Sequence, residues 1–113
     1  MVKLNVSVGQ DDQRVAGWLY KGGSQVTGAL GDAASNRRRS TTAALVRQDH
    51  GVESMAFDYL DSPSTTSATT YSIRLSHGNA SNKTLYLNRA YHDTDHVSYF
   101  RSTSSLILME IAA

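Results

Sequence analysis

The chain has 113 residues, a common length for one domain built around one hydrophobic core. Charged residues make up 19% of it and its net charge is +1, so its overall field is too weak to attract nucleic acid or an anionic membrane. The sequence contains no Cys, which excludes disulfides, thiolate metal sites and cysteine nucleophiles. It also lacks an apolar run near the ~20 residues that cross a bilayer. We therefore expect neither nucleic acid nor a membrane as a partner.

Residues 2–8 have the clearest strand pattern in the sequence. Apolar and polar residues alternate there, in the order Val2, Lys3, Leu4, Asn5, Val6, Ser7 and Val8. Successive side chains of a strand point to opposite faces, so this pattern predicts one face in the core and one in solvent. We expect Lys3, Asn5 and Ser7 to face the solvent.

The next elements read as a hairpin followed by a long loop. Val15–Tyr20 forms a strand that contains the only Trp, Trp18, and Gln25–Leu30 is expected to return antiparallel to it. The Gly-Gly pair in Lys21–Ser24 permits the positive φ values of a tight turn. Gly31–Ser40 has many turn-forming residues and no apolar periodicity, which predicts a loop.

Further strands follow with turn-forming residues between them. They are expected at Thr41–Arg47, Ser54–Leu60, Thr69–Leu75 and Lys83–Arg89, with Met55, Phe57 and Tyr59 on one face. The only Pro, Pro63, lies in a connection, because proline lacks the donor that a central strand needs. With the C-terminal segment this makes about eight short strands. We therefore predict an all-β fold, an antiparallel β-sandwich, as a single domain over residues 1–113.

The last predicted strand, Ser105–Ile111, is apolar on both of its alternating faces. Its apolar residues are Leu106, Ile107, Leu108, Met109 and Ile111. If about 300 Å² of one face were exposed, its burial would contribute on the order of 7 kcal/mol before the costs of association. A second copy of the chain is the simplest cover. The alternatives are that a loop of the same chain covers this face, or that Leu108 and Met109 point into an internal layer of the fold.

The segment His92–His96 is the one stretch that resembles a metal site, with two imidazoles and two carboxylates. On a strand, however, residues four apart lie about 13 Å from each other, which is too far for one ion. A solvated loop explains the segment better, and neither a nucleophile nor a Gly-rich oxyanion segment accompanies it. We expect no metal, no cofactor and no catalytic residue.

Two groups of residues are candidates for binding a partner. Arg37, Arg38 and Arg39 lie consecutively in the predicted loop, and guanidinium groups suit carboxylate, phosphate or sulfated glycan. Near the C-terminus, Tyr91, His92 and Tyr99 belong to a second polar loop. Trp18, Tyr86, Tyr91 and Tyr99 are possible platforms for sugar rings or bases, although aromatic residues in strand-rich proteins mostly build core and cross-strand pairs.

Three stretches of the chain resemble one family of proteins. They are Gly31–Arg37 (GDAASNR), Phe57–Tyr71 (FDYLDSPSTTSATTY) and Ser102–Ile111 (STSSLILMEI). Together they are similar to the C-terminal jelly-roll modules of structural proteins of marine and cyanobacterial tailed phages, modules that tend to form trimers. The resemblance extends over nearly the whole chain, and it implies a jelly-roll-like sandwich.

The resemblance also implies a role and an assembly. The chain would be a noncatalytic virion protein, either a capsid-decorating or cement subunit or the receptor-binding tip of a tail fibre. It would form a homotrimer with Leu106, Leu108 and Met109 near the axis, and would contact the major capsid protein or a host surface receptor. Because the sequence starts at Met1 without a longer attachment region, we expect a compact free-standing virion protein or an excised tip. The alternative is a carbohydrate-binding, lectin-like module outside any virion.

Overall fold

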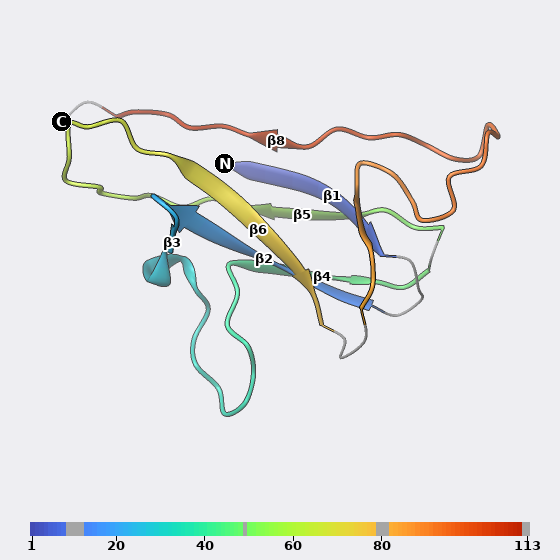
Figure 1. The fold of residues 1–113 in the computed structure, drawn as a ribbon, viewed down its shortest axis with the longest axis horizontal. Coiled ribbons are helices and arrows are strands. Elements are labelled where there is room, and N and C mark those ends of the chain that lie inside the picture. The colour runs from blue at the N-terminus through green and yellow to red at the C-terminus, as the bar shows by residue number, and fades with distance from the viewer. Residues whose placement is uncertain (9–12, 49, 79–81, 112–113) are drawn as a thin grey trace.

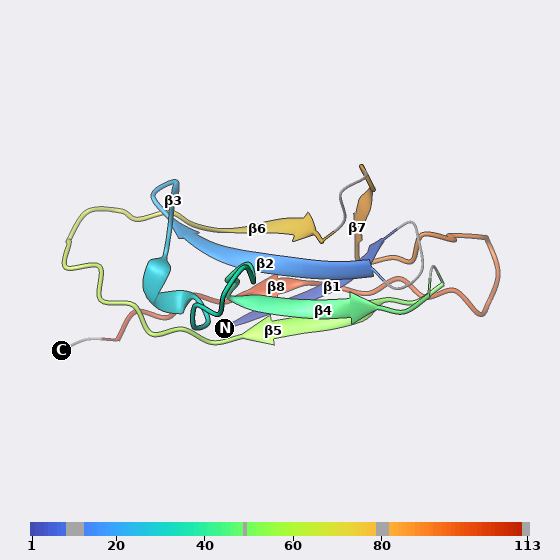
Figure 2. The same cartoon turned by 90° about the horizontal axis from the view of Figure 1, so that it is seen from below.

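The computed structural model describes residues 1–8, 13–48, 50–78 and 82–111 of the chain. These residues form eight β-strands in two four-stranded antiparallel sheets, which pack against each other (Figures 1 and 2). The fold is thus the antiparallel β-sandwich that the sequence predicts. Among the described residues, no helix is long and apolar enough to cross a membrane.

Each sheet is assembled around one long strand. The first sheet contains β1 (Val2–Val8), β5 (Glu53–Phe57), β7 (Leu85–Leu87) and β8 (Ser105–Leu106). The second contains β2 (Gln13–Lys21), β3 (Ser24–Gln25), β4 (Thr42–Val46) and β6 (Tyr71–His77), with a 3-10 turn, η1 (Thr27–Ala29), after β3. The chain passes from β1 to β2, β3 and β4, back to β5, across to β6, and back to β7 and β8. This alternation between sheets is jelly-roll-like.

The pairing of β1 explains the layout of the first sheet. Val2 and Lys3 pair with both β5 and β8, so these two strands lie on opposite edges of β1. Val6 pairs with both β5 and β7, which places β7 on the same edge as β8. β7 and β8 therefore share one edge of β1, and the chain between them leaves the sheet and returns to it.

The core lies between the sheets and follows the alternation of the sequence. The apolar residues of β1 are buried together with Val15, Val46 and Met55, and Ile73 and Leu75 of β6 pack against this cluster. Burying an aliphatic side chain of this size stabilises the fold by roughly 1.5–3 kcal/mol. The predicted inward face of residues 2–8 is confirmed, and so is the half-buried alternation of β6.

The predicted solvent face of β1 is wrong for two of its three residues. Lys3 is exposed, whereas Asn5 is 7% and Ser7 0% exposed. Tyr86 lies directly opposite Ser7 and shares its face, and the Asn5 side chain donates a hydrogen bond to the carbonyl of Thr103. The sequence pattern did not show that the C-terminal part of the chain covers this face.

Asn5 is the centre of a polar network that joins three parts of the chain. Its side-chain oxygen accepts a hydrogen bond from Ser54 Oγ at 2.7 Å, and its backbone N–H donates to Ser104 Oγ at 3.1 Å. The backbone N–H of Asn88 donates to the Asn5 carbonyl at 2.8 Å. Ser104 Oγ in turn donates to Asn88 Oδ1 at 2.6 Å. β5, the end of β7 and the chain returning to β8 therefore meet at one buried residue.

The predicted hairpin after β2 is confirmed at its turn and wrong in its return strand. Gly22 and Gly23 have φ values of +55° and +83°, as the turn requires. The return strand is limited to β3 and is followed by η1, so a strand over Gln25–Leu30 does not form. At Gly28 the backbone approaches Tyr59, and a Cβ there would lie 2.5 Å from the Tyr59 hydroxyl. This close approach replaces the extended pairing.

Two other predicted strands end earlier than expected. The strand predicted at Ser54–Leu60 stops at Phe57, so Tyr59 lies beyond the sheet and does not continue the face of Met55. The strand predicted at Ser105–Ile111 stops at Leu106, with one further exchange of backbone hydrogen bonds between Ile107 and Met1. The described pairing of this segment with β1 is thus limited to Ser105 and Leu106.

An ion pair ties the connection between β5 and β6 to the second sheet. Lys21 Nζ lies 2.8 Å from a carboxylate oxygen of Asp61, and the Tyr71 hydroxyl donates to the same oxygen at 2.6 Å. The hydrogen bond from Lys21, followed by that from Tyr71, lowers the pKa of Asp61 below its usual value. The same contact raises the pKa of Tyr71, because the phenol is held as a donor.

The Asn5 network predicts a large effect of a small substitution. Asn5→Ala leaves the Thr103 carbonyl and the Ser54 hydroxyl without the amide, and should lower the free energy of unfolding by about 2–4 kcal/mol in urea denaturation. Lys3→Ala, on the same strand but exposed, is the matched control and should change it by less than about 0.5 kcal/mol. Equal stability of the two variants would contradict this role of Asn5.

Candidate functional site

The residues predicted to bind partners lie on separate parts of the molecule. The loop with Arg37, Arg38 and Arg39 projects below the second sheet in Figure 1, whereas the loop 89–101 extends at the right-hand end. The C-terminal segment runs along the upper edge in the same view. The candidate site therefore consists of three surfaces, which are taken in turn.

The first surface is built on the outer face of the second sheet. Trp18 of β2 lies directly opposite Arg74 of β6, so the two side chains share a face. Leu19 and Ile73, the next pair along, belong to the opposite face, where Leu19 is buried. Tyr20 lies two residues beyond Trp18 and therefore shares its outer face.

The arginine loop is fastened over this face through Trp18. The indole Nε1 donates a hydrogen bond to the carbonyl of Arg39 at 2.7 Å, and the Arg38 guanidinium carbon lies 5.3 Å from the centre of the Trp18 ring. Arg39 Nε donates to the Gly31 carbonyl at 2.6 Å, which closes the loop on itself. The loop thereby covers Trp18, which is only 8% exposed.

The arginine loop and strands β2 and β6 line an open pocket of about 440 Å³, called the arginine pocket below. Its lining residues are Trp18, Tyr20, Gln25, Arg38, Arg39, Arg74, Leu75 and Ser76. Two of the predicted arginines, Arg38 and Arg39, are in this lining, and Arg37 is not. Sequence reasoning missed Arg74, because its alternation showed only that it faces outward and not that β6 lies beside Trp18.

The second surface is the loop 89–101, in which the structure brings Tyr91, His92 and Tyr99 together with His50. The rings of His50 and His92 are stacked with centres 4.6 Å apart, and Tyr91 meets His92 edge-on at 4.9 Å. His50 Nδ1 and the Tyr99 hydroxyl are within hydrogen-bond distance at 3.1 Å. His50, from the connection between β4 and β5, was missed because no sequence pattern relates it to this loop.

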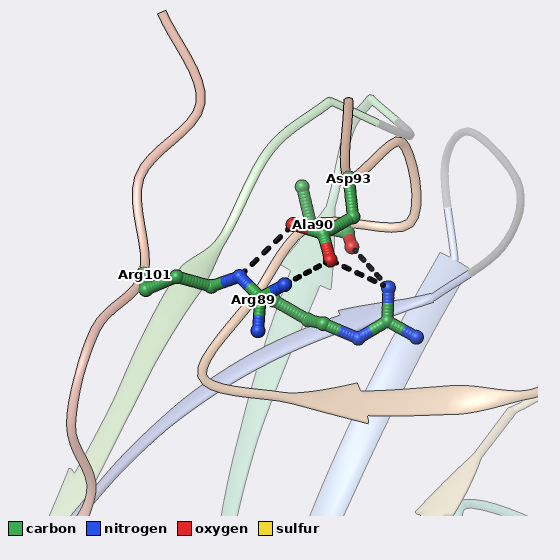
Figure 3. Close-up of polar contacts among 4 residues, drawn as sticks. All are labelled: Arg89, Ala90, Asp93 and Arg101. Atoms are coloured by element: carbon green, nitrogen blue, oxygen red, sulfur yellow. Dashed lines mark hydrogen bonds and ion pairs between the residues drawn. The ribbon is translucent and has the colours of Figure 1, made fainter. Parts of the chain in front are cut away.

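An arginine–carboxylate clamp holds the base of this second loop (Figure 3). Asp93 accepts from Arg101 through both carboxylate oxygens, one of them 3.0 Å from Arg101 Nε, and its second oxygen lies 3.5 Å from Arg89 Nη1. Arg89 also lies over the Tyr86 ring at 4.3 Å. Ser102 N–H donates to the Asn88 carbonyl at 3.0 Å, which closes the loop where it leaves the sheet.

The carboxylates and imidazoles of His92–His96 are not gathered around a common point. In the part of the chain that the structure describes, no group of three or more His, Asp or Glu side chains is placed to hold a metal ion. Asp93 is engaged by its two arginines, and His96 Nδ1 accepts a hydrogen bond from the Ser98 N–H at 3.2 Å. The loop presents aromatic rings and paired charges, which suit the binding of a partner.

The third surface is the C-terminal strip, residues 106–111. Leu106 is 42%, Leu108 60% and Met109 77% exposed, and Ile111 is also exposed. Of the covers considered from the sequence, a loop of the same chain and an internal layer for Leu108 and Met109 are therefore wrong. Within one chain the apolar side chains of the strip remain open to solvent.

Comparisons of the chain with protein-family models, with curated proteins and with solved structures gave no match. The case for a function accordingly rests on the geometry of the three surfaces.

The clamp predicts a local effect of removing Asp93. Asp93→Ala should speed amide hydrogen exchange across residues 91–100 by tenfold or more, because the loop loses its tie to Arg89 and Arg101. The free energy of global unfolding should fall by less than about 1 kcal/mol, since exposed ion pairs contribute little. Asp95→Ala, which removes a carboxylate of the same loop that has no ion pair with a described residue, is the control. Unchanged exchange in the Asp93 variant would refute the clamp.

Proposed function

We propose that this chain is a noncatalytic structural protein of a phage virion, either a capsid-decorating or cement subunit or the receptor-binding tip of a tail fibre. It assembles as a homotrimer in the virion. Its other partners are virion proteins such as the major capsid protein, or a receptor on the host surface. The observation that carries the proposal is the exposure of the C-terminal strip, whose apolar side chains a single chain leaves uncovered.

A second copy of the chain is the occupant that best fits this strip. The strip leads on from the edge of the first sheet, where Ile107 exchanges backbone hydrogen bonds with Met1, and its apolar side chains are exposed. Leu108, Met109 and Ile111 are 60%, 77% and 74% exposed, which is unusual on a monomer for apolar residues so close together in the sequence. The resemblance to trimeric phage modules supports a threefold arrangement, with Leu106, Leu108 and Met109 at the axis.

The two loops are the surfaces that we assign to other partners. Arg37, Arg38 and Arg39 are exposed and meet acidic groups of the partner, on a virion protein or on a host receptor, through charge-assisted hydrogen bonds. In the second loop, Tyr91, His92 and Tyr99 form a contact surface to which Val97 and Phe100 add exposed apolar area, at 88% and 77%. Both loops lie away from the strip in Figure 1, so a trimer leaves them accessible.

A carbohydrate-binding, lectin-like module is the second candidate, and the arginine pocket favours it. The pocket combines guanidinium groups with two aromatic residues and two uncharged polar residues, Gln25 and Ser76. Such a set suits a small polar ligand. The two candidates are compatible if the virion protein recognises a glycan.

Trimer formation is tested by the mass of the purified protein in solution. Multi-angle light scattering at micromolar concentration should give three times the mass of one chain. Leu108→Asp and Met109→Asp should each yield monomer or aggregate, because a charge buried at the axis without a partner costs several kcal/mol. Leu60→Asp replaces an apolar residue that is 79% exposed outside the strip, and should leave the trimer intact. A monomeric wild-type protein would sink the proposal.

Attachment through the arginine loop is tested on virions. A variant with Arg37, Arg38 and Arg39 replaced by Ala should keep the trimer mass but lose tenfold or more in occupancy on virions, or in adsorption to host cells. The wild-type contact should weaken as salt concentration rises. Arg47→Ala removes an exposed arginine elsewhere and serves as the control. Full occupancy of the triple variant at every salt concentration would move the contact to the Tyr91–Tyr99 loop.

A further inference from the structure

We infer that the arginine pocket binds an acidic saccharide, a sugar ring that carries a carboxylate. This inference rests on the noncatalytic binding role proposed above and names the ligand class for one of its surfaces. It concerns Arg38, Arg39 and Arg74 on the outer face of the second sheet, with Arg37 outside the pocket.

The charge of the pocket points to an anion. Its lining includes three guanidinium groups and no carboxylate. Among the described residues neither Arg38 nor Arg74 forms an ion pair, whereas Arg89 and Arg101 share Asp93 and Lys21 pairs with Asp61. These three cations are thus neutralised within the chain. In the pocket the positive charge is left for a ligand.

The guanidinium groups are also held in place before any ligand arrives. Arg74 lies over the Tyr20 ring at 3.9 Å, and Arg38 lies over the Trp18 ring at 5.3 Å. Arg39 is tied through Nε to the Gly31 carbonyl, which leaves its terminal nitrogens to donate elsewhere. A guanidinium held by its ring face keeps its N–H edge for a carboxylate, which it binds with two parallel hydrogen bonds. Little side-chain entropy remains to be lost on binding.

The size and the remaining lining favour a sugar over an acidic protein surface. A volume of about 440 Å³ falls in the range of small-molecule sites, whereas a stable protein interface needs roughly 800 Å² on each partner. Gln25 and Ser76 supply uncharged donors and acceptors, which match the hydroxyl groups of a sugar ring. Carboxylate and hydroxyl groups on one compact ring satisfy both parts of the pocket.

The test uses the indole N–H of Trp18, since the chain has a single Trp and that residue lines the pocket. In NMR titrations of the full chain, glucuronate should shift this resonance with a Kd in the millimolar range or below. Glucose should leave it unchanged at the same concentration, because it has the ring without the carboxylate. Acetate, which has the carboxylate without the ring, should bind at least fivefold more weakly.

Variants assign the effect to the pocket. Arg74→Ala and Arg38→Ala come from different elements, and each should weaken glucuronate binding tenfold or more while the spectrum stays that of a folded protein. Arg47→Ala, which removes an exposed arginine outside the lining, should bind like the wild type.

Four outcomes would overturn the inference. They are no shift of the Trp18 indole resonance with glucuronate up to about 10 mM, equal binding of acetate, tighter binding of a triglutamate peptide than of glucuronate, and an equal loss in the Arg47 variant. Equal binding of acetate would reduce the pocket to a simple anion site, and tighter binding of triglutamate would assign it to a protein partner. The trimer mass and virion occupancy are measured independently of these titrations, so a failure here leaves the proposed assembly standing.

Discussion

The buried side-chain amide of Asn5 is the constraint around which the rest of the molecule is arranged. An amide that is 7% exposed has to satisfy its donor and acceptor groups inside the protein, because an unsatisfied buried polar group costs about 1–3 kcal/mol. Ser54 and Thr103 provide the partners of the side-chain amide, and Ser104, next to Thr103, accepts from the Asn5 backbone N–H. Their convergence brings β5 to one side of β1 and the C-terminal segment to the other. Two of the candidate surfaces follow from this arrangement: the loop 89–101 leaves the sheet where Ser102 bonds Asn88, and the C-terminal strip follows the pairing of β8 with β1.

In the second sheet, Trp18 fixes the position of a loop, as Asn5 does in the first sheet. Its side chain lies on the outer face, where a large apolar ring would otherwise be exposed, and the loop Gly31–Ser40 covers it. The hydrogen bond from the indole to the Arg39 carbonyl places the neighbouring Arg38 over the ring. The loop thus shields the Trp18 ring from solvent. Its residues Arg38 and Arg39 line the same pocket as Arg74. Two of the arginines that the sequence places in a loop, Arg38 and Arg39, thus line one side of the arginine pocket.

The sequence predicted the elements with local signals and missed the relations between distant elements. The alternation over residues 2–8 and the Gly22–Gly23 turn depend on neighbouring residues, and both appear as expected. The burial of Asn5 and the position of Arg74 beside Trp18 depend on which strands pair, and a period-2 pattern contains no information about partners. The same limit applies to β8, whose pairing with β1 covers only Ser105 and Leu106. In the candidate site, Arg38, Arg39, Tyr91, His92 and Tyr99 were found by residue type, whereas His50 and Arg74 required the fold.

Electron cryomicroscopy of the assembled protein tests the central claim most directly, because the account assigns assembly to one edge of the sandwich and recognition to other faces. The account predicts three chains around a threefold axis, with Leu108 and Met109 buried against their copies and the outer face around Trp18 open to solvent. Density for a particle in which the C-terminal strips face solvent, or in which the arginine pocket is buried between copies, would contradict it.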